Sequence, residues 1–128
     1  MLVSCTLALL LCGCPSLLQV RLASQEERLP APRFVVIDPD HLDRPRYHTL
    51  QVMERQGTLF WHLRAEPFGE LNSVGQLAYG EPLAGFEAVE GPVPLQPGGR
   101  YALFVLGMNR GSLYFDVDSE GRVYAVPP

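Results

Sequence analysis

The stretch that decides the fold is Leu95-Gln96-Pro97-Gly98-Gly99-Arg100-Tyr101, followed directly by Ala102-Leu103-Phe104-Val105-Leu106. Proline followed by two glycines predicts a tight turn, because proline presets its own φ and glycine accepts a positive φ. Residues 100–106 form the strongest apolar run after the N-terminal segment, and a short run that is apolar on both faces indicates a central strand. Turn and strand together predict a corner from which the chain enters the middle of a β-sheet.

The chain from Phe34 onward predicts an antiparallel all-β domain. Short apolar runs alternate with Gly, Pro, Asp and Asn, turn signals recur about every ten residues, and no segment sustains a helical period. The clearest pair is Tyr47–Glu54 and Thr58–Arg64, which a turn at Gln56-Gly57 joins into a hairpin. The other predicted strands are Phe34–Ile37, Val74–Tyr79, Gly85–Val89, Arg100–Leu106, Leu113–Val117 and Arg122–Val126. Seven or eight strands of this kind predict a single antiparallel β-sandwich.

The corner carries a family resemblance. Leu95-x-Pro97-Gly98-x-x-Tyr101 resembles the E–F corner of fibronectin type III and related immunoglobulin-like domains. The resemblance implies that the Tyr101 ring packs in the core while its hydroxyl bonds the backbone a few residues upstream. It also implies that Trp61 matches the buried strand-C tryptophan, so Trp61, Pro97 and Tyr101 have structural roles. The strand at Arg122–Val126 lies beyond the usual last one, which leaves a transthyretin-like sandwich as the alternative.

The N-terminal stretch Met1–Leu11 is almost entirely apolar and leads into Leu11-Cys12-Gly13-Cys14. It is shorter than the roughly 20 apolar residues of a membrane-spanning helix, and it fits the apolar region of a secretory signal better. Leu-x-Gly-Cys after such a run resembles the lipobox of bacterial lipoprotein precursors. The resemblance implies cleavage before Cys14 and lipidation of its thiol. A hydrophobic N-terminal strand or tail is the alternative interpretation.

The lipoprotein resemblance implies an order of segments and a location. Residues 1–13 are the expected signal peptide, 14–33 the lipidated N-terminus with an extended tether, and 34–128 the sandwich domain. Acyl chains on Cys14 anchor the chain to membrane lipid, because two or more chains bind a bilayer stably. The domain is then expected in the periplasm of a bacterial cell envelope. Pro15 is not the aspartate associated with inner-membrane retention, so the outer membrane is favoured.

The composition argues against several classes of function. The 128 residues contain ten basic and fourteen acidic side chains, a net charge of −4, and no basic stripe that would indicate nucleic-acid binding. All ten basic residues are arginine. Cys5, Cys12 and Cys14 are the three cysteines, so the expected domain contains no disulfide and no cysteine-ligated zinc.

The clusters of polar residues favour turns over metal-binding or catalytic sites. Asp38, Asp40, His41 and Asp43 could supply oxygen ligands to calcium, but aspartates beside a proline more often bond their own backbone. The segment 116–121 begins like an EF-hand loop, yet Pro127 stands where the final glutamate belongs, so a hairpin turn is predicted. His48 and His62 lie on adjacent predicted strands and could face one another. We expect no catalytic residues, no metal and no cofactor.

The remaining candidate is an apolar second face. Phe104 and Leu106 point away from Leu103 and Val105, so the central strand is apolar on both sides. With Phe60, His62 and Tyr114 on neighbouring strands, Phe104 is predicted to form a contact surface, unless a loop or the tether covers it.

The predicted function is a membrane-anchored, non-catalytic module that binds an envelope protein or serves in envelope assembly. The alternative is a small metal-binding or hydrolytic domain that uses Asp38, Asp40, His41 and His62.

Overall fold

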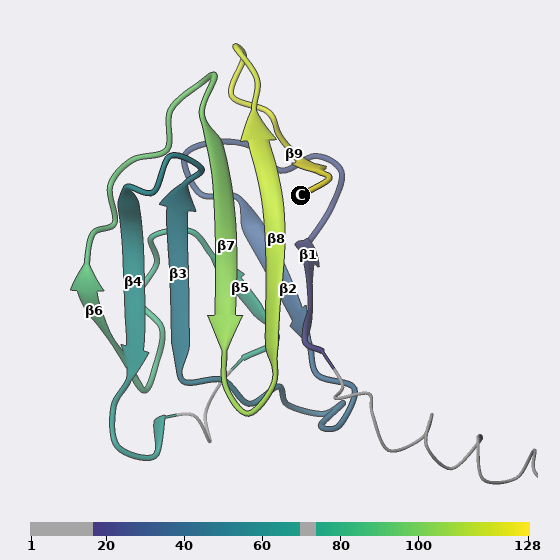
Figure 1. Cartoon of the computed structure of the whole chain (residues 1–128), viewed down its shortest axis with the longest axis vertical. Helices are drawn as coiled ribbons and strands as arrows, with labels where there is room; N and C mark the ends of the chain where they lie inside the picture. The colour runs from purple at the N-terminus through teal and green to yellow at the C-terminus, as the bar shows by residue number, and fades with distance from the viewer. Residues whose placement is uncertain (1–16, 70–73) are drawn as a thin grey trace, which may run out of the picture.

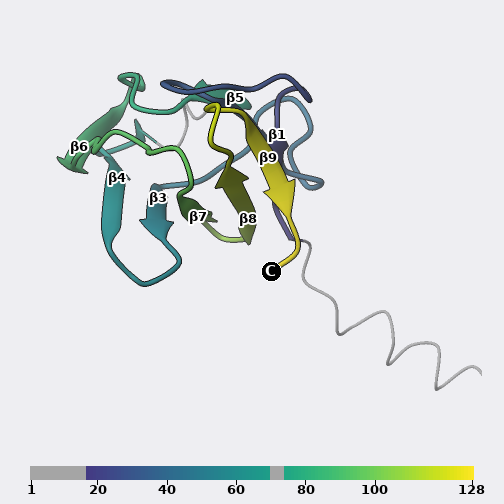
Figure 2. The same ribbon diagram turned by 90° about the horizontal axis from the view of Figure 1, so that it is seen from above.

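The structure is a computed structural model that describes residues 17–69 and 74–128. These residues form nine strands and no helix, and all strand pairs are antiparallel, in two sheets that pack face to face (Figure 1, Figure 2). The all-β sandwich that the sequence predicts is therefore confirmed. The strands are β1 (Gln19–Leu22), β2 (Arg33–Ile37), β3 (Thr49–Glu54), β4 (Leu59–Ala65), β5 (Gln76–Ala78), β6 (Phe86–Glu90), β7 (Arg100–Leu106), β8 (Arg110–Val117) and β9 (Val123–Val126). Within these two described ranges, no helix could span a bilayer.

The larger sheet has the strand order β6-β4-β3-β7-β8-β9. β7 pairs with β8 over its whole length and with β3 on its other side, so the strongest apolar run is a central strand as predicted. β3 and β4 form the predicted hairpin, with the amide of Gly57 bonded to the carbonyl of Glu54 in the turn. The inner-facing side chains Leu50, Leu103 and Val105 are fully buried against the smaller sheet.

The smaller sheet has the order β1-β2-β5, and its strand β1 lies in the predicted tether. Residues 19–22 pair with 34–37, and the amide of Leu18 donates to the carbonyl of Arg110 at the start of β8. The close approach requires Gly111, because a Cβ there would lie 2.2 Å from the Leu18 carbonyl oxygen. The prediction of an extended tether that reaches to residue 33 is therefore wrong, because residues 19–22 pair with the free edge of β2 as a strand.

The loop between β1 and β2 is fixed to the larger sheet as well. Glu27 is buried, and its carboxylate accepts hydrogen bonds from Ser24, from the backbone amide of Arg33 and from the Arg33 guanidinium. The Arg33 hydrogen bond outweighs burial and lowers the pKa of Glu27 to about 2. The Glu27 carbonyl accepts from the amide of Val123 in β9. The sandwich thus includes the chain from Leu18 onward, and the predicted domain start at Phe34 is too late.

The corner before β7 has the contacts that the sequence predicts. The amide of Gln96 donates to the Tyr101 hydroxyl at 2.9 Å, while the Tyr101 ring packs between Phe60 and Phe115, with centroids at 5.3 and 5.5 Å. The ring folds back over Gly99, where a Cβ would lie 2.2 Å from the hydroxyl oxygen. Trp61 is buried as predicted, and its ring meets Tyr79 edge-on at 5.0 Å.

Phe60 of β4 does not lie on the outer face, where the predicted contact surface places it. Val52 pairs with Trp61 but Met53 pairs with Leu59, so Phe60 is the extra residue of a β-bulge. A bulge re-aims the side chain of the inserted residue. Phe60 accordingly turns inward beside Trp61, in contact with Tyr101, and its side chain is 8% exposed.

Candidate functional site

The outer face of the six-stranded sheet carries a half-buried aromatic pair. Phe104 of β7 and Tyr114 of β8 meet edge-to-face, with their ring centroids 6.2 Å apart. The strand register places Tyr114 in one row with four other non-polar residues, Leu59, Met53, Ala102 and Val126. Because directly opposed residues of antiparallel strands share a face, these side chains form one apolar band across five strands. We call Met53, Phe104, Leu106 and Tyr114 of this face the outer-face patch.

Arginine borders the patch on one side. The guanidinium carbon of Arg55 lies 5.2 Å from the centre of the Tyr114 ring, a cation–π contact. Asp116 lies near both Arg55, at 3.8 Å, and Arg100, at 4.0 Å. Its buried Oδ1 has no hydrogen-bond partner among the described residues. Glu54 lines the same border beside Arg55, so the border carries charged groups of both signs.

Two hollows adjoin the outer-face patch. One, of about 620 Å³, extends toward the start of β1 and is lined by Leu17, Leu18, Gln51, Met53, Phe104, Leu106, Arg110, Gly111 and Ser112. The other, of about 340 Å³, lies toward the opposite end and includes Arg55, Tyr114 and Pro128. Apolar walls with an arginine at the margin suit a partner side chain better than a charged metabolite.

The structure brings together three of the four predicted contact residues. His62 and Phe104 both pair with Gln51 and share its outward direction, and Tyr114 lies one strand beyond Phe104. Phe60 is the exception, because the bulge places it in the core. Its predicted role in the contact surface is therefore wrong.

The loop between β2 and β3 is built around Asp38. The Asp38 carboxylate is buried and accepts from the amides of Asp40 and Arg46, at 3.0 and 3.4 Å, and lies 3.2 Å from His41 Nδ1. Burial raises the pKa of Asp38, but the two backbone hydrogen bonds and His41 outweigh it, so the pKa lies below its usual value. The aspartate thus organises a turn, as the simpler interpretation of the sequence expects.

The residues that the metal-binding alternative requires do not lie together at one site. His62 lies on the outer face of β4, whereas Asp38 follows β2 of the other sheet. Among the residues that the structure describes, no group of three or more His, Cys, Asp and Glu side chains could hold a metal ion. His48 and His62 do not face each other, because the His48 carbonyl accepts from Ala65 and His62 pairs with Gln51. The hairpin turn predicted at 118–121 is present, with Asp118 Oδ1 accepting from the amides of Glu120 and Arg122.

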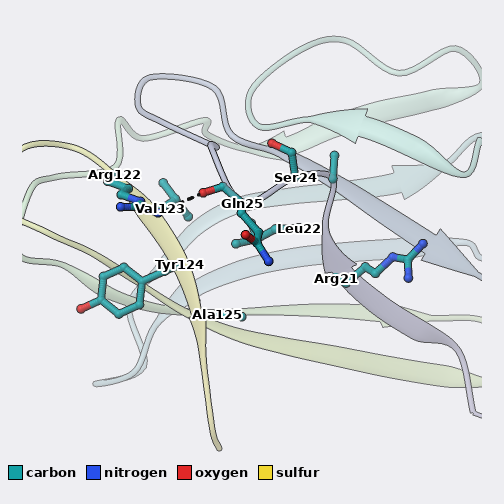
Figure 3. A pocket seen from close by; sticks show the side chains of 9 residues that line it. Arg21, Leu22, Ser24, Gln25, Arg122, Val123, Tyr124 and Ala125 are labelled. Atoms are coloured by element: carbon teal, nitrogen blue, oxygen red, sulfur yellow. Dashed lines mark hydrogen bonds between the residues drawn. The ribbon is translucent and has the colours of Figure 1, made fainter.

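A further groove, of about 520 Å³, separates β1 from β9 (Figure 3). Figure 3 shows Leu22 and Gln25 on one side and Val123–Ala125 on the other, with Arg122 bonded to the Gln25 carbonyl at 3.4 Å across the top. Arg21 points out of the groove. The described lining contains no carboxylate or imidazole, so it offers no acid–base pair.

Sequence reasoning missed two members of the candidate site. Met53 could have been found by extending the alternation of β3, in which Thr49 and Gln51 already point outward. Arg55 lies in the turn after β3, and no local pattern indicates its position over Tyr114.

Comparison with protein-family models, with curated proteins and with solved structures finds no match to this chain.

Proposed function

We propose that the chain is a bacterial lipoprotein whose β-sandwich is a non-catalytic binding module, held at the periplasmic side of the outer membrane by acyl chains on Cys14. The Leu11-Cys12-Gly13-Cys14 stretch supports the anchor. The absence of any cysteine after residue 14 supports it too, because Cys14 is then the last thiol before the domain.

One observation carries the binding role, namely the composition of the outer-face patch. Tyr, Phe, Met and Arg are the residue types enriched where proteins bind one another, and truncation of such residues costs most when they lie at the centre of a contact. Here an aromatic pair, two further apolar side chains and a stacked arginine lie together on one face, with a hollow on either side. The partner we infer is an envelope protein that presents an apolar side chain to this face.

We also propose the finer fold class. The Tyr101 corner and the buried Trp61 support a fibronectin type III or immunoglobulin-like sandwich. The additional strand β9 is the feature that a transthyretin-like arrangement would explain instead.

The anchor is tested by intact-mass spectrometry of the chain purified from bacterial membranes. We expect a mass that begins at Cys14 and carries the acyl groups, together with an unprocessed, unacylated mass for Cys14→Ser. A wild-type chain that keeps residues 1–13 and an unmodified thiol would refute the lipoprotein assignment.

The binding face is tested by cross-linked capture of partners from envelopes that contain the anchored protein. Tyr114→Ala is expected to lose the captured partner. Val93→Ala, which shortens an exposed apolar side chain outside the patch, is expected to retain it. Equal recovery with both variants would exclude the outer-face patch as the contact surface.

A further inference from the structure

The first described residue and three of the connecting loops lie at the same end of the sandwich. Thr49 at the start of β3 pairs with Leu106 at the end of β7, and Leu106 pairs with Arg110 at the start of β8. The amide of Ala65 at the end of β4 bonds the carbonyl of His48, and Leu18 bonds Arg110. The loops that follow β2, β4 and β7 therefore lie at the same end as Leu17, the lower end in Figure 1. We call this the entry end.

The entry end carries the most exposed large apolar side chains of the described residues. Their exposed fractions are 99% for Met108, 80% for Leu42, 76% for Phe68 and 62% for Leu17, whereas no other large apolar residue within 17–69 and 74–128 exceeds 44%. Met108, Leu42 and Phe68 belong to three different loops. Single exposed apolar residues are common on soluble proteins, but four of them collected at one end mark a contact surface.

Phe68 is the most informative of the four. It occupies the third position of the turn 66–69, which the bond from the amide of Gly69 to the carbonyl of Glu66 closes, and Pro67 precedes it. Its φ of 64° is one that such a turn normally assigns to glycine. A bulky residue there strains the backbone, and its exposed ring gains no packing in return. Neither turn geometry nor the core explains this phenylalanine, so its exposed ring requires another explanation.

The loops of the entry end are bonded to one another. The Asn109 amide donates to Asp40 at 3.1 Å, which joins the β7–β8 turn to the β2–β3 loop. The Tyr47 hydroxyl donates to the carbonyl of Val74 at 2.8 Å, which joins the β2–β3 loop to the segment before β5. The exposed apolar side chains therefore project from an ordered platform, so that presenting them together requires little additional ordering.

We propose that the entry end is a lipid-facing surface, on which Leu17, Leu42, Phe68 and Met108 enter the headgroup region of the membrane. The proposal rests on the anchor at Cys14. Two residues lie between Cys14 and Leu17, and the three Cα-to-Cα steps from one to the other span at most roughly 11 Å in a fully extended chain. The anchored chain therefore enters the fold within about one headgroup layer of the acyl chains, and apolar groups at such a boundary insert by roughly 5–10 Å.

The charges of the entry end favour an apolar contact over an electrostatic one. Its described loops and the first residue of β8 carry four acidic side chains, Asp38, Asp40, Asp43 and Glu66, against three basic ones, Arg44, Arg46 and Arg110, so no excess of positive charge attracts anionic lipid. Binding that depends on inserted apolar side chains is expected to persist at high salt, whereas attraction to anionic lipid would be screened.

The test places one fluorescent label at each end of the intact lipidated protein in vesicles of phosphatidylethanolamine and phosphatidylglycerol. Met108→Cys labels the entry end, and Ser119→Cys labels the β8–β9 turn at the opposite end. Quenching by spin-labelled lipid chains is expected to be at least about threefold stronger at 108 than at 119, and to be unchanged in high salt. Equal quenching at both positions overturns the proposal, as does protection of position 108 only when envelope proteins are added.

Two further measurements distinguish a failure of this proposal from a failure of the anchor and from misfolding of a variant. Phe68→Gly, which suits a positive φ, is expected to fold normally and to lower quenching at 108, whereas Val93→Ser outside the entry end is expected to leave it unchanged. Unchanged quenching in Phe68→Gly overturns the role of the ring. The mass of the purified chain reports acylation of Cys14 separately, so an anchored protein with an unquenched entry end refutes the docking alone.

Discussion

Replacing Tyr101 by phenylalanine isolates one hydrogen bond of the corner before β7. The ring contacts with Phe60 and Phe115 remain, whereas the amide of Gln96 loses its acceptor at 2.9 Å. A hydrogen bond of this kind contributes about 1 kcal/mol, and a donor that is left partly buried adds to the loss. We expect Tyr101→Phe to destabilise the domain by about 1–1.5 kcal/mol, which lowers Tm by roughly 3–6 °C in a domain of this size.

The measurement is urea unfolding followed by fluorescence of Trp61, the single tryptophan, which is buried in the core. The matched control is Tyr114→Phe, because the Tyr114 hydroxyl makes no hydrogen bond within residues 17–69 and 74–128 and its ring is half-buried. The control is expected to unfold within about 0.3 kcal/mol of the wild-type protein. A stability of Tyr101→Phe equal to that of Tyr114→Phe would refute the corner as a stabilising contact.

Three further predictions concern glycine, charge and backbone strain. Gly99→Ala should destabilise by about 2 kcal/mol or more in thermal unfolding, since the new Cβ would overlap the Tyr101 hydroxyl, and an unchanged Tm would contradict the folded-back ring. The pKa of Glu27 is lowered to about 2 from 4.5, so its stabilising effect is complete above about pH 4.5 and disappears as the pH falls toward 2. Because Arg33 is half exposed and partly screened, we expect Glu27→Gln to lose about 1–2 kcal/mol at pH 7 and little at pH 2, and a pH-independent loss in urea unfolding would argue against the ion pair. Phe68→Gly should raise the free energy of unfolding by about 1 kcal/mol in calorimetry, and a lower Tm would show that the ring supports the fold.

Local patterns predicted the strands whose neighbours in sequence are also their neighbours in space. The range 100–106 matches β7 at both ends, because a turn that requires glycine precedes it and an apolar run fills it. The hairpin of β3 and β4 was predictable for the same reason. By contrast β1 has only four residues, in which Gln19 and Arg21 alternate with Val20 and Leu22, and it becomes a strand because β2 offers it a free edge.

The residues of the contact surface likewise divide into those that local alternation predicts and those that only the pairing of strands places. Phe104 and Tyr114 follow from alternation along β7 and β8, since the period of a strand assigns each residue to a face. Phe60 could not be assigned correctly, because a bulge depends on the register between two strands and has no local signal. Arg55 likewise reaches Tyr114 only through the pairing of β3 with β7 and of β7 with β8.

The sequence by itself determined the all-β class, the corner at Tyr101 and the position of the candidate anchor at Cys14, since each depends on residues close together in the chain. The tertiary structure decided what depends on distant residues. It joined residues 19–22 to the sandwich, placed Phe60 in the core, and collected Leu17, Leu42, Phe68 and Met108 at one end. No local sequence pattern indicates that these four apolar residues belong to one surface. Strand register alone determines that the loops end side by side, and register is a property of the paired sheets.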